Sequence, residues 1–473
     1  MKTTSTMKTT SDGRRSTRRQ FLRQSACAAV GLTAAANTLF DLRRIAAAAT
    51  LADSRSLVCV FLYGGNDGNN LIVPAAGADY SRYAAARAGL ALPQTSLLPL
   101  KPLERPAGDT REWGLHPSLT GVQGLFNAGR AALVANVGPL VAPLTRDEYL
   151  ARSVAVPPQL FSHSDQTLHW QTSLPDQPAK TGWGGRTADL LRALNGNARI
   201  SMSISVAGTN TFQVGNVVTQ YQVAPEGPVG LTSYVPASQG PDASSNAIRS
   251  LLARSYGNLF ERGYSGVFQR ALDNQELLST ALAGAPPLAT TFPATDLGQQ
   301  LAMVAKLVAV REALGLRRQV FFCAAQGYDT HGGQVGTSAL DGTHADLLAE
   351  LDGALAAFET AMNELGAADS VTTFTASDFG RTYLPNGDGS DHGWGSHHIV
   401  LGGAVRGGRL YGQIPTLAVD GPDDAGDGRW IPTTSVDEYA ATLARWFGVA
   451  SSDLPLVLPN LGRFATTDLG FME

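Results

Sequence analysis

The chain has 473 residues, which is enough for one large domain or two of ordinary size. Its formal net charge of −4 argues against a nucleic-acid partner, because such proteins carry a basic face or stripe. Three cysteines are too few for a cysteine-rich zinc site, so a metal ion would have to be bound by histidine and carboxylate side chains. Cys59 and Cys323 lie in apolar strand-like runs, and we expect two buried thiols.

The first 49 residues have the pattern of an export leader. Residues 17–22 read TRRQFL and precede a mildly apolar stretch over residues 26–39, as in twin-arginine signals. We therefore expect transport by the twin-arginine translocation machinery and a periplasmic or extracellular mature protein, residues 50–473. The alternative is an ordinary basic tail before a helix. The apolar stretch is short and interrupted by Asn37, and no later run reaches spanning length, so no stable membrane span is expected.

Apolar strand-like runs alternate with helical patterns along the rest of the chain. Strands are expected at residues 56–63, 131–137, 319–325, 371–376 and from 399 to 401 onward. Helices are expected at residues 117–126, 187–194 (after a turn at 181–186), 297–316 and 345–365. This alternation predicts an α/β fold with a mostly parallel central sheet and helices on both faces. Residues 206–239 are polar, β-like and rich in glycine and proline, and we expect a β-rich insertion or cap over about 206–296.

Metal-binding residue types follow several of these strands. Asp67 comes after the first strand, Asp329 and His331 after the strand that ends at 325, and Asp378 with Arg381 after the strand that ends at 376. In a parallel sheet the carboxyl ends of the strands lie at one edge, where ligands bind. Distant segments are therefore expected to meet in one site.

One more group belongs to the same pattern. Asp391 and His392 precede the strand that begins near residue 399, with His397 and His398 between them. Carboxylates with imidazoles suit Zn²⁺ or Mn²⁺, whereas an all-oxygen site suits Mg²⁺ or Ca²⁺. One or two divalent ions are expected. Each residue taken singly has another interpretation, as a turn, a cap or a local ion pair.

Six stretches resemble the family catalogued as domain of unknown function 1501, a sulfatase-like branch of the alkaline phosphatase superfamily. They are FLYGGNDGNNLIVP, LFSHSDQTLHWQTS, TGWGGRTADLL, GYDTHGGQ, FTASDFGRT and DHGWGSHHIVLGG. The resemblance covers nearly the whole mature chain and implies an alkaline phosphatase-like fold. Members of this family commonly carry the same type of export signal.

The resemblance also implies a set of metal ligands. The residues that would match those of the superfamily are Asp67, Asp329, His331, Asp378 and His392, with Asp391, His397 and His398 as alternatives if the register differs. Phe379 stands where the superfamily has the histidine of an Asp-His pair, which departs from a full two-zinc site.

The nucleophile of the superfamily opens a helix, where exposed N–H groups favour an anion. Ser162 fits this place and Ser164 is the reserve, although either serine can simply cap that helix. Arg381 is expected either to clamp a phosphate or sulfate oxygen or to neutralise Asp378. The remaining histidines have other expected roles: general acid or polar helix residue for His163 and His169, structural for His116, and surface for His344.

The leading hypothesis is a metal-dependent hydrolase of phosphate, phosphonate or sulfate esters, acting on a small-molecule or polymer substrate. The sequence lacks the cysteine-centred motif that sulfatases convert to formylglycine, which disfavours a standard sulfatase mechanism. The main alternative is a non-catalytic exported binding or scaffold protein that keeps the fold. A metal-dependent mutase or isomerase is a further alternative, which an exported location disfavours.

Overall fold

The computed structural model describes residues 53–104 and 109–473. The proposed leader, residues 1–49, lies outside this part of the chain. Among the described residues no helix has both the length and the apolar character needed to cross a bilayer.

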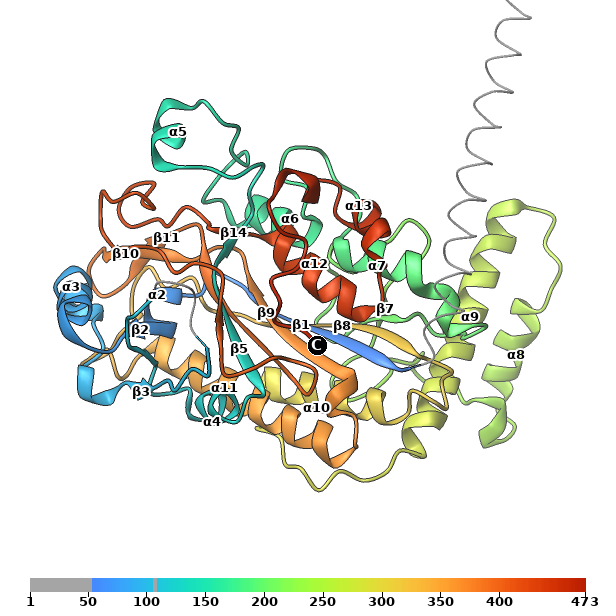
Figure 1. The fold of residues 1–473 in the computed structure, drawn as a ribbon. Helices are drawn as coiled ribbons and strands as arrows, with labels where there is room; N and C mark the ends of the chain where they lie inside the picture. Colours follow the sequence, from blue (N-terminus) through green and yellow to red (C-terminus); the bar gives the residue numbers. More distant parts are fainter. Residues whose placement is uncertain (1–52, 105–108) are drawn as a thin grey trace, which may run out of the picture.

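A single large sheet organises the protein (Figure 1). Its strands follow the order β13-β5-β12-β9-β1-β8-β6-β7, and β14 also pairs with β5. Strand bounds are β1 Arg55–Leu62, β5 Ala131–Gly138, β6 Ser203–Ser205, β7 Tyr221–Gln222, β8 Arg318–Ala325, β9 Val371–Ser377, β12 Ser396–Gly402, β13 Leu410–Tyr411 and β14 Thr434–Ser435. Strand β12 is antiparallel to both β5 and β9, while the other pairs are parallel. The prediction of a mostly parallel α/β sheet is confirmed.

Helices cover both faces of this sheet (Figure 1). One face carries α4 Thr120–Asn127, α10 Asp296–Ala309 and α11 Thr343–Glu364. The other carries α6 His163–Thr172, α7 Trp183–Leu191, α12 Val436–Phe447 and α13 Leu454–Val457. The core lies between these layers and includes nearly every side chain of β1 and β8, as expected for parallel strands that are covered on both sides.

Smaller elements complete the fold. They are α2 Gly68–Leu71, β2 Ile72–Pro74, α3 Gly77–Arg87, β3 Leu98–Pro99, β4 Trp113–Leu115, α5 Arg146–Ala151, and the hairpin of β10 Arg381–Pro385 with β11 Ser390–His392. Strands β2, β4 and β3 form a separate small sheet. The short 3₁₀ segments are Ala88–Leu90, Gln94–Ser96, Arg192–Asn195, Ala237–Gln239, Ala368–Ser370, Ser451–Asp453 and Leu461–Arg463.

The insertion at 206–296 is helical, so the expectation of a β-rich segment is wrong. It contains α8 Ala243–Leu252 and α9 Leu259–Ala283, and β7 is its one named strand. Asp242 and Asn258 cap the N-termini of the two helices through their side chains, which favours helix over strand in this segment. Figure 1 shows α8 and α9 beyond the β7 edge of the sheet, at the opposite end from β10 and β11, so they do not cover the hairpin.

Two helix boundaries also differ from the prediction. Helix α7 begins at Trp183, inside the expected turn. The glycines of that segment are packing positions instead of turn positions: a Cβ on Gly185 would lie 2.1 Å from the backbone of Val214. Helix α10 ends at Ala309 rather than at 316: Val310 leaves the helical conformation, and Gly315 with a φ of +69° ends the turn that follows.

Cys59 and Cys323 are buried free thiols, as predicted. In the register of β1 and β8, Cys59 is opposite Phe322, and Cys323 is opposite Val60. Since neighbours in register share a face and successive residues alternate, the two thiols point to opposite faces of the sheet. A disulfide between them is therefore excluded by the pairing.

Candidate metal centre

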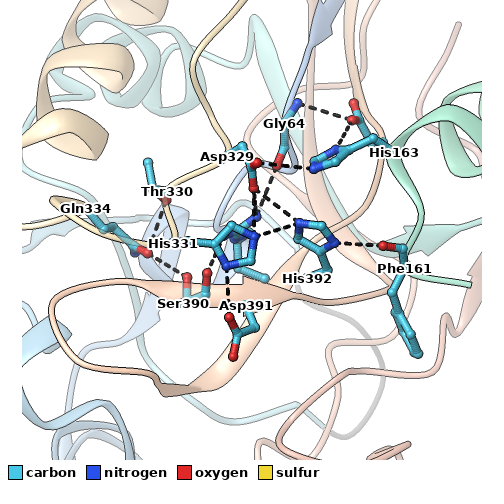
Figure 2. Close-up of polar contacts among 12 residues, drawn as sticks. Gly64, Phe161, His163, Asp329, Thr330, His331, Gln334, Ser390, Asp391 and His392 are labelled. Carbon is cyan, nitrogen blue, oxygen red and sulfur yellow. Dashed lines mark hydrogen bonds and ion pairs between the residues drawn. The ribbon is translucent and has the colours of Figure 1, made fainter.

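Three histidines surround Asp329 at the carboxyl edge of the central strands, and we call this group the histidine cluster (Figure 2). Asp329 and His331 lie in the loop that follows β8, His392 is the last residue of β11, and His163 is the first residue of α6. The loop after β1 is part of the same edge, because Gly64 packs against the backbone of Asp329: a Cβ on this glycine would lie 2.3 Å from its nitrogen.

The Nε2 atoms of all three histidines face the carboxylate of Asp329. They lie 3.3 Å (His163), 3.1 Å (His331) and 3.2 Å (His392) from its oxygens. The Nε2 atoms of His331 and His392 are 2.8 Å apart. Ligand atoms of His163, Asp329 and His392 all lie within 4.8 Å of one another, as they would around a metal ion.

The Nδ1 atom of each imidazole, on the side of the ring away from Asp329, contacts an oxygen atom of the protein. Nδ1 of His392 lies 2.7 Å from the carbonyl oxygen of Phe161, which can only accept a hydrogen bond, so this Nδ1 carries the proton. Nδ1 of His331 lies 2.9 Å from Asp391, and Nδ1 of His163 lies 2.8 Å from Asp378. A proton on Nδ1 leaves the lone pair of a neutral imidazole on Nε2, directed at Asp329. This is the arrangement in which histidines bind metals.

The contact between His163 and Asp378 leaves one carboxylate oxygen without a partner. Oδ1 of Asp378 is buried and accepts no hydrogen bond, whereas Oδ2 also accepts from the amide of Gly64 at 3.2 Å, and Nε2 of His163 has only the 3.3 Å contact with Asp329. The hydrogen bond to Asp378 raises the pKa of His163 above its ordinary value. Buried polar atoms rarely stay unsatisfied, so the free oxygen of Asp378 is consistent with a further bound group beside the cluster.

Arg381 lies behind Asp329 rather than beside Asp378. Its Nη1 donates to Oδ1 of Asp329 at 2.8 Å, and Nη2 donates to the carbonyl of Ser390. Partial burial works to raise the pKa of Asp329, but the hydrogen bond and charge of Arg381 hold it below its ordinary value. The guanidinium of Arg381 is fully buried. In this conformation it holds Asp329 in place and does not reach an anion in solvent.

Asp67 lies outside the histidine cluster. It is the N-cap of α2, and its carboxylate forms a fully buried ion pair with Arg87 and accepts from Gln334 at 2.6 Å. Burial works to raise the pKa of Asp67, but the charge of Arg87 outweighs it and the pKa is lowered. Its oxygens are thus occupied by protein donors, and we leave Asp67 out of the ligand set considered below.

Ser162 is the N-cap residue of α6 and directly precedes His163 of the histidine cluster. Its hydroxyl donates to Asp165 at 2.6 Å and contacts Ser164 at 3.2 Å, instead of capping the helix. The preceding Phe161 has a φ of +72°, which is rare for a bulky side chain. This strained backbone turns the carbonyl of Phe161 toward His392, and such strain is concentrated at functional sites.

Phe379 packs against two of the histidines, His163 and His392. Its ring centroid lies 4.8 Å from that of His163 and 4.6 Å from that of His392. The residue that replaces the expected histidine beside Asp378 is therefore an apolar wall of the cluster. His163, 215 residues earlier in the chain than Asp378, supplies the imidazole that contacts this carboxylate.

The other histidines are structural. Burial lowers the pKa of four of them: His116 to about 3, His344 to about 4, His397 to about 4 and His398 to about 3. His344 is buried against Asn66, so its expected surface position is wrong. His169 is also buried, on the inner side of α6.

His163 is the cluster member that sequence reasoning did not include among the ligands. The signal for it was weak, because a histidine at the start of a helix is usually a polar surface residue. Its place is set by α6, whose contact with β9 brings residue 163 over Asp378. Arg87, the partner of Asp67, gave no signal at all, since an arginine at the end of a helix is ordinary.

Comparisons with known proteins give solved structures of low sequence identity and low structural similarity. A comparison with curated proteins finds no match. Among solved structures, Ps i-CgsB in complex with k-i-k-neocarrahexaose is 11% identical, with 85% of this chain and 74% of that chain covered and a TM-score of 0.33. The PsFucS1 sulfatase from Pseudoalteromonas sp. is 10% identical, covers 88% and 73%, and has a TM-score of 0.34.

A phosphonate monoester hydrolase of Agrobacterium radiobacter is 13% identical over 86% of this chain and 77% of that chain, with a TM-score of 0.29. Similarity at these values carries no information about activity. The family model described as "Protein of unknown function (DUF1501)" matches residues 54–427, which include the whole histidine cluster. Because the match spans most of the chain, this protein belongs to the DUF1501 family.

Proposed function

We propose that the chain is an exported, metal-dependent hydrolase of phosphate, phosphonate or sulfate esters. The observation that supports it is the convergence of three Nε2 lone pairs on one carboxylate, each fixed by an acceptor behind the ring. The Nε2 atoms of His331 and His392 lie 2.8 Å apart, so one cation bound at Asp329 could accept the lone pairs of both rings. The ester class follows from the sequence resemblance.

Three nitrogens and one oxygen are a donor set that fits Zn²⁺ or Mn²⁺ better than Mg²⁺ or Ca²⁺. A bound ion would supply polarisation of the ester oxygen and stabilisation of the leaving oxyanion. The proposed ligands are His163, Asp329, His331 and His392. Asp378, Asp391 and the carbonyl of Phe161 hold the rings in place, as metal-site carboxylates and carbonyls commonly do.

Ser162 remains the proposed nucleophile. It opens a helix of ten residues, where backbone N–H groups favour an anionic group. Its hydroxyl already donates to Asp165, which gives the proton an acceptor when the oxygen attacks. The side chains of Asp329 and His331 are 44% and 46% exposed, so a substrate can reach the cluster from solvent.

Export is part of the same proposal, with the twin-arginine pattern at residues 17–22 as its support. The twin-arginine machinery moves folded proteins, which suits a protein that acquires a metal before transport. The expected location is periplasmic or extracellular.

One observation favours a non-catalytic binding or scaffold protein. Arg381 already neutralises Asp329, which weakens the attraction of this carboxylate for a cation. The two functions differ in turnover, because a scaffold with the same fold would hydrolyse nothing in any metal form.

The test is a panel of chromogenic phosphate, phosphonate and sulfate esters, assayed with the protein as purified, after chelation and after return of Zn²⁺ or Mn²⁺. We expect hydrolysis of at least one ester class that is lost on chelation and restored by one of the ions. Asp329→Ala should lose activity, whereas Asp273→Ala on the exposed face of α9 should keep it. Absence of turnover in every metal form would contradict the hydrolase and leave the scaffold.

A further inference from the structure

Large apolar side chains are exposed at the tip of the helical insertion, far from the histidine cluster. We call residues 248–270, the end of α8, the turn and the start of α9, the hairpin tip. Its exposed members are Leu251 (49%), Leu259 (71%), Phe260 (85%), Tyr264 (71%) and Val267 (59%). Soluble proteins rarely gather so many exposed apolar side chains in one place unless the place binds something.

These side chains form a continuous surface. Phe260, Tyr264 and Val267 are spaced four and three residues apart, so they share one side of α9. Tyr264 and Phe268 stack with ring centroids 6.1 Å apart. Beside them lies a groove of about 360 Å³ between the two helices, lined mainly by Ile248, Leu251, Leu252, Tyr256, Tyr264 and Phe268.

The hairpin tip is basic although the whole chain carries a formal net charge of −4. It contains Arg249, Arg254, Arg262 and Arg270, with Glu261 as its one acidic residue. Of these arginines, Arg254, Arg262 and Arg270 are exposed. Within the described residues these three arginines form no ion pair with a carboxylate, and Arg249 contacts Tyr234 and Asn246.

Exposed aromatic and aliphatic side chains flanked by arginines are the composition of surfaces that lie in a membrane interface. The apolar side chains enter the boundary between headgroups and acyl chains, while the arginines stay at the level of anionic headgroups. Figure 1 shows α8 and α9 projecting from the β7 edge of the sheet, so a planar surface can approach their tip.

We propose that the hairpin tip docks the protein on an anionic phospholipid surface. A second copy of the chain fits less well, because a symmetric pairing of two tips would place their arginines against each other. The docking leaves the histidine cluster, at the opposite end of the sheet, open to solvent (Figure 1). It does not depend on the proposed hydrolase activity.

Vesicle co-sedimentation of the full chain tests this docking. Vesicles of phosphatidylcholine with one-third phosphatidylglycerol are compared with vesicles of phosphatidylcholine alone. We expect binding to the anionic vesicles that falls about tenfold or more in Phe260→Ser/Val267→Ser, since two exposed apolar side chains no longer insert. Arg254→Gln/Arg262→Gln should reduce binding to anionic vesicles roughly tenfold and weaken its salt dependence.

The matched control is Leu103→Ser/Leu150→Ser, which replaces exposed leucines elsewhere on the surface (71% and 55% exposed). The control should bind as the unchanged chain does. Comparison within one full-length chain also cancels any binding by the apolar residues 26–39. Equal binding by all variants would overturn the proposal. So would a concentration-dependent dimer, seen by light scattering without lipid, that Phe260→Ser/Val267→Ser abolishes.

Discussion

Nδ1 of His163 lies 2.8 Å from Oδ2 of Asp378, although 215 residues separate them in the chain. This contact fixes the ring of His163 so that Nε2 faces Asp329 at 3.3 Å. The strand β9 delivers Asp378 and the helix α6 delivers His163, so the geometry of the cluster depends on the packing of that helix on the sheet.

Replacement of Asp378 therefore tests the support behind the cluster. Asp378→Asn keeps the shape but removes the charge that holds Nδ1–H of His163, and metal affinity should fall about 10- to 100-fold. Competition with a chromogenic chelator measures this change. The surface variant Asp79→Asn, which alters an exposed contact with Arg82, should leave the affinity unchanged. Equal affinity of Asp378→Asn and the unchanged protein would show that His163 is no ligand.

The two serines at the start of α6 can be separated by activity. Ser162→Ala should abolish ester hydrolysis while metal content stays the same, because the hydroxyl is the proposed nucleophile and lies outside the ligand set. Ser164→Ala is the matched control, being exposed two residues away, and should keep most of the rate. If Ser162→Ala turns over at the full rate, water or another group is the nucleophile.

Much of the fold could be predicted from the sequence, because buried parallel strands such as 319–325 read as continuous apolar runs and α11 has a clear apolar stripe. The helical insertion could not be predicted from the glycine- and proline-rich stretch 206–239, because the helices lie after it and are capped by Asp242 and Asn258. Strand ends also predicted where Asp329, His331 and Asp378 would lie.

The partners within the site were much harder to predict. Whether a carboxylate at a strand end faces a histidine or an arginine depends on elements from other parts of the chain. Asp67 faces Arg87 of α3, and Asp378 faces His163 of α6. Neither pairing leaves a periodic signal in the sequence, since each depends on tertiary packing alone.

Acid should destabilise the protein through four buried histidines. Burial holds their pKa values at about 3 to 4, and the Nδ1 atoms of His116 and His397 accept backbone N–H groups, which requires a neutral ring. In the unfolded chain each would bind a proton below its ordinary pKa near 6.5. Stability conferred by the neutral rings is thus present above pH 6.5 and lost as the pH falls toward 4.

The slope contributed by four protons is at most about 5 kcal/mol per pH unit near pH 5. Urea unfolding at pH 7, 6 and 5 measures it. The variant His397→Gln should show a shallower pH dependence than the unchanged protein. A free energy of unfolding that stays constant from pH 7 to pH 5 would contradict the buried neutral state of these rings.

Asp437 should have the opposite effect. Burial raises its pKa to about 7 despite the charge of Arg186, and Oδ1 has no hydrogen-bond partner. Because its folded pKa exceeds the unfolded value near 4, the stability it confers is present below pH 4 and lost as the pH rises to 7. Asp437→Asn should therefore stabilise the protein at pH 8 by up to about 4 kcal/mol and have little effect at pH 4.5.

Urea unfolding of Asp437→Asn at pH 8 and pH 4.5 measures this change in the free energy of unfolding. The exposed variant Asp273→Asn serves as the control and should change stability little at either pH. A loss of stability of the same size at both pH values would mean that Asp437 makes a specific polar contact that the amide cannot replace.

The central claim is that the histidine cluster holds a divalent cation. Its most direct measurement is the metal content of folded, full-length protein purified without added metal, by inductively coupled plasma mass spectrometry. The account predicts about one Zn²⁺ or Mn²⁺ per chain, largely lost in Asp329→Ala and in His392→Ala but retained in Asp273→Ala. Protein that folds normally, contains no metal and takes up none from added Zn²⁺ or Mn²⁺ would contradict it.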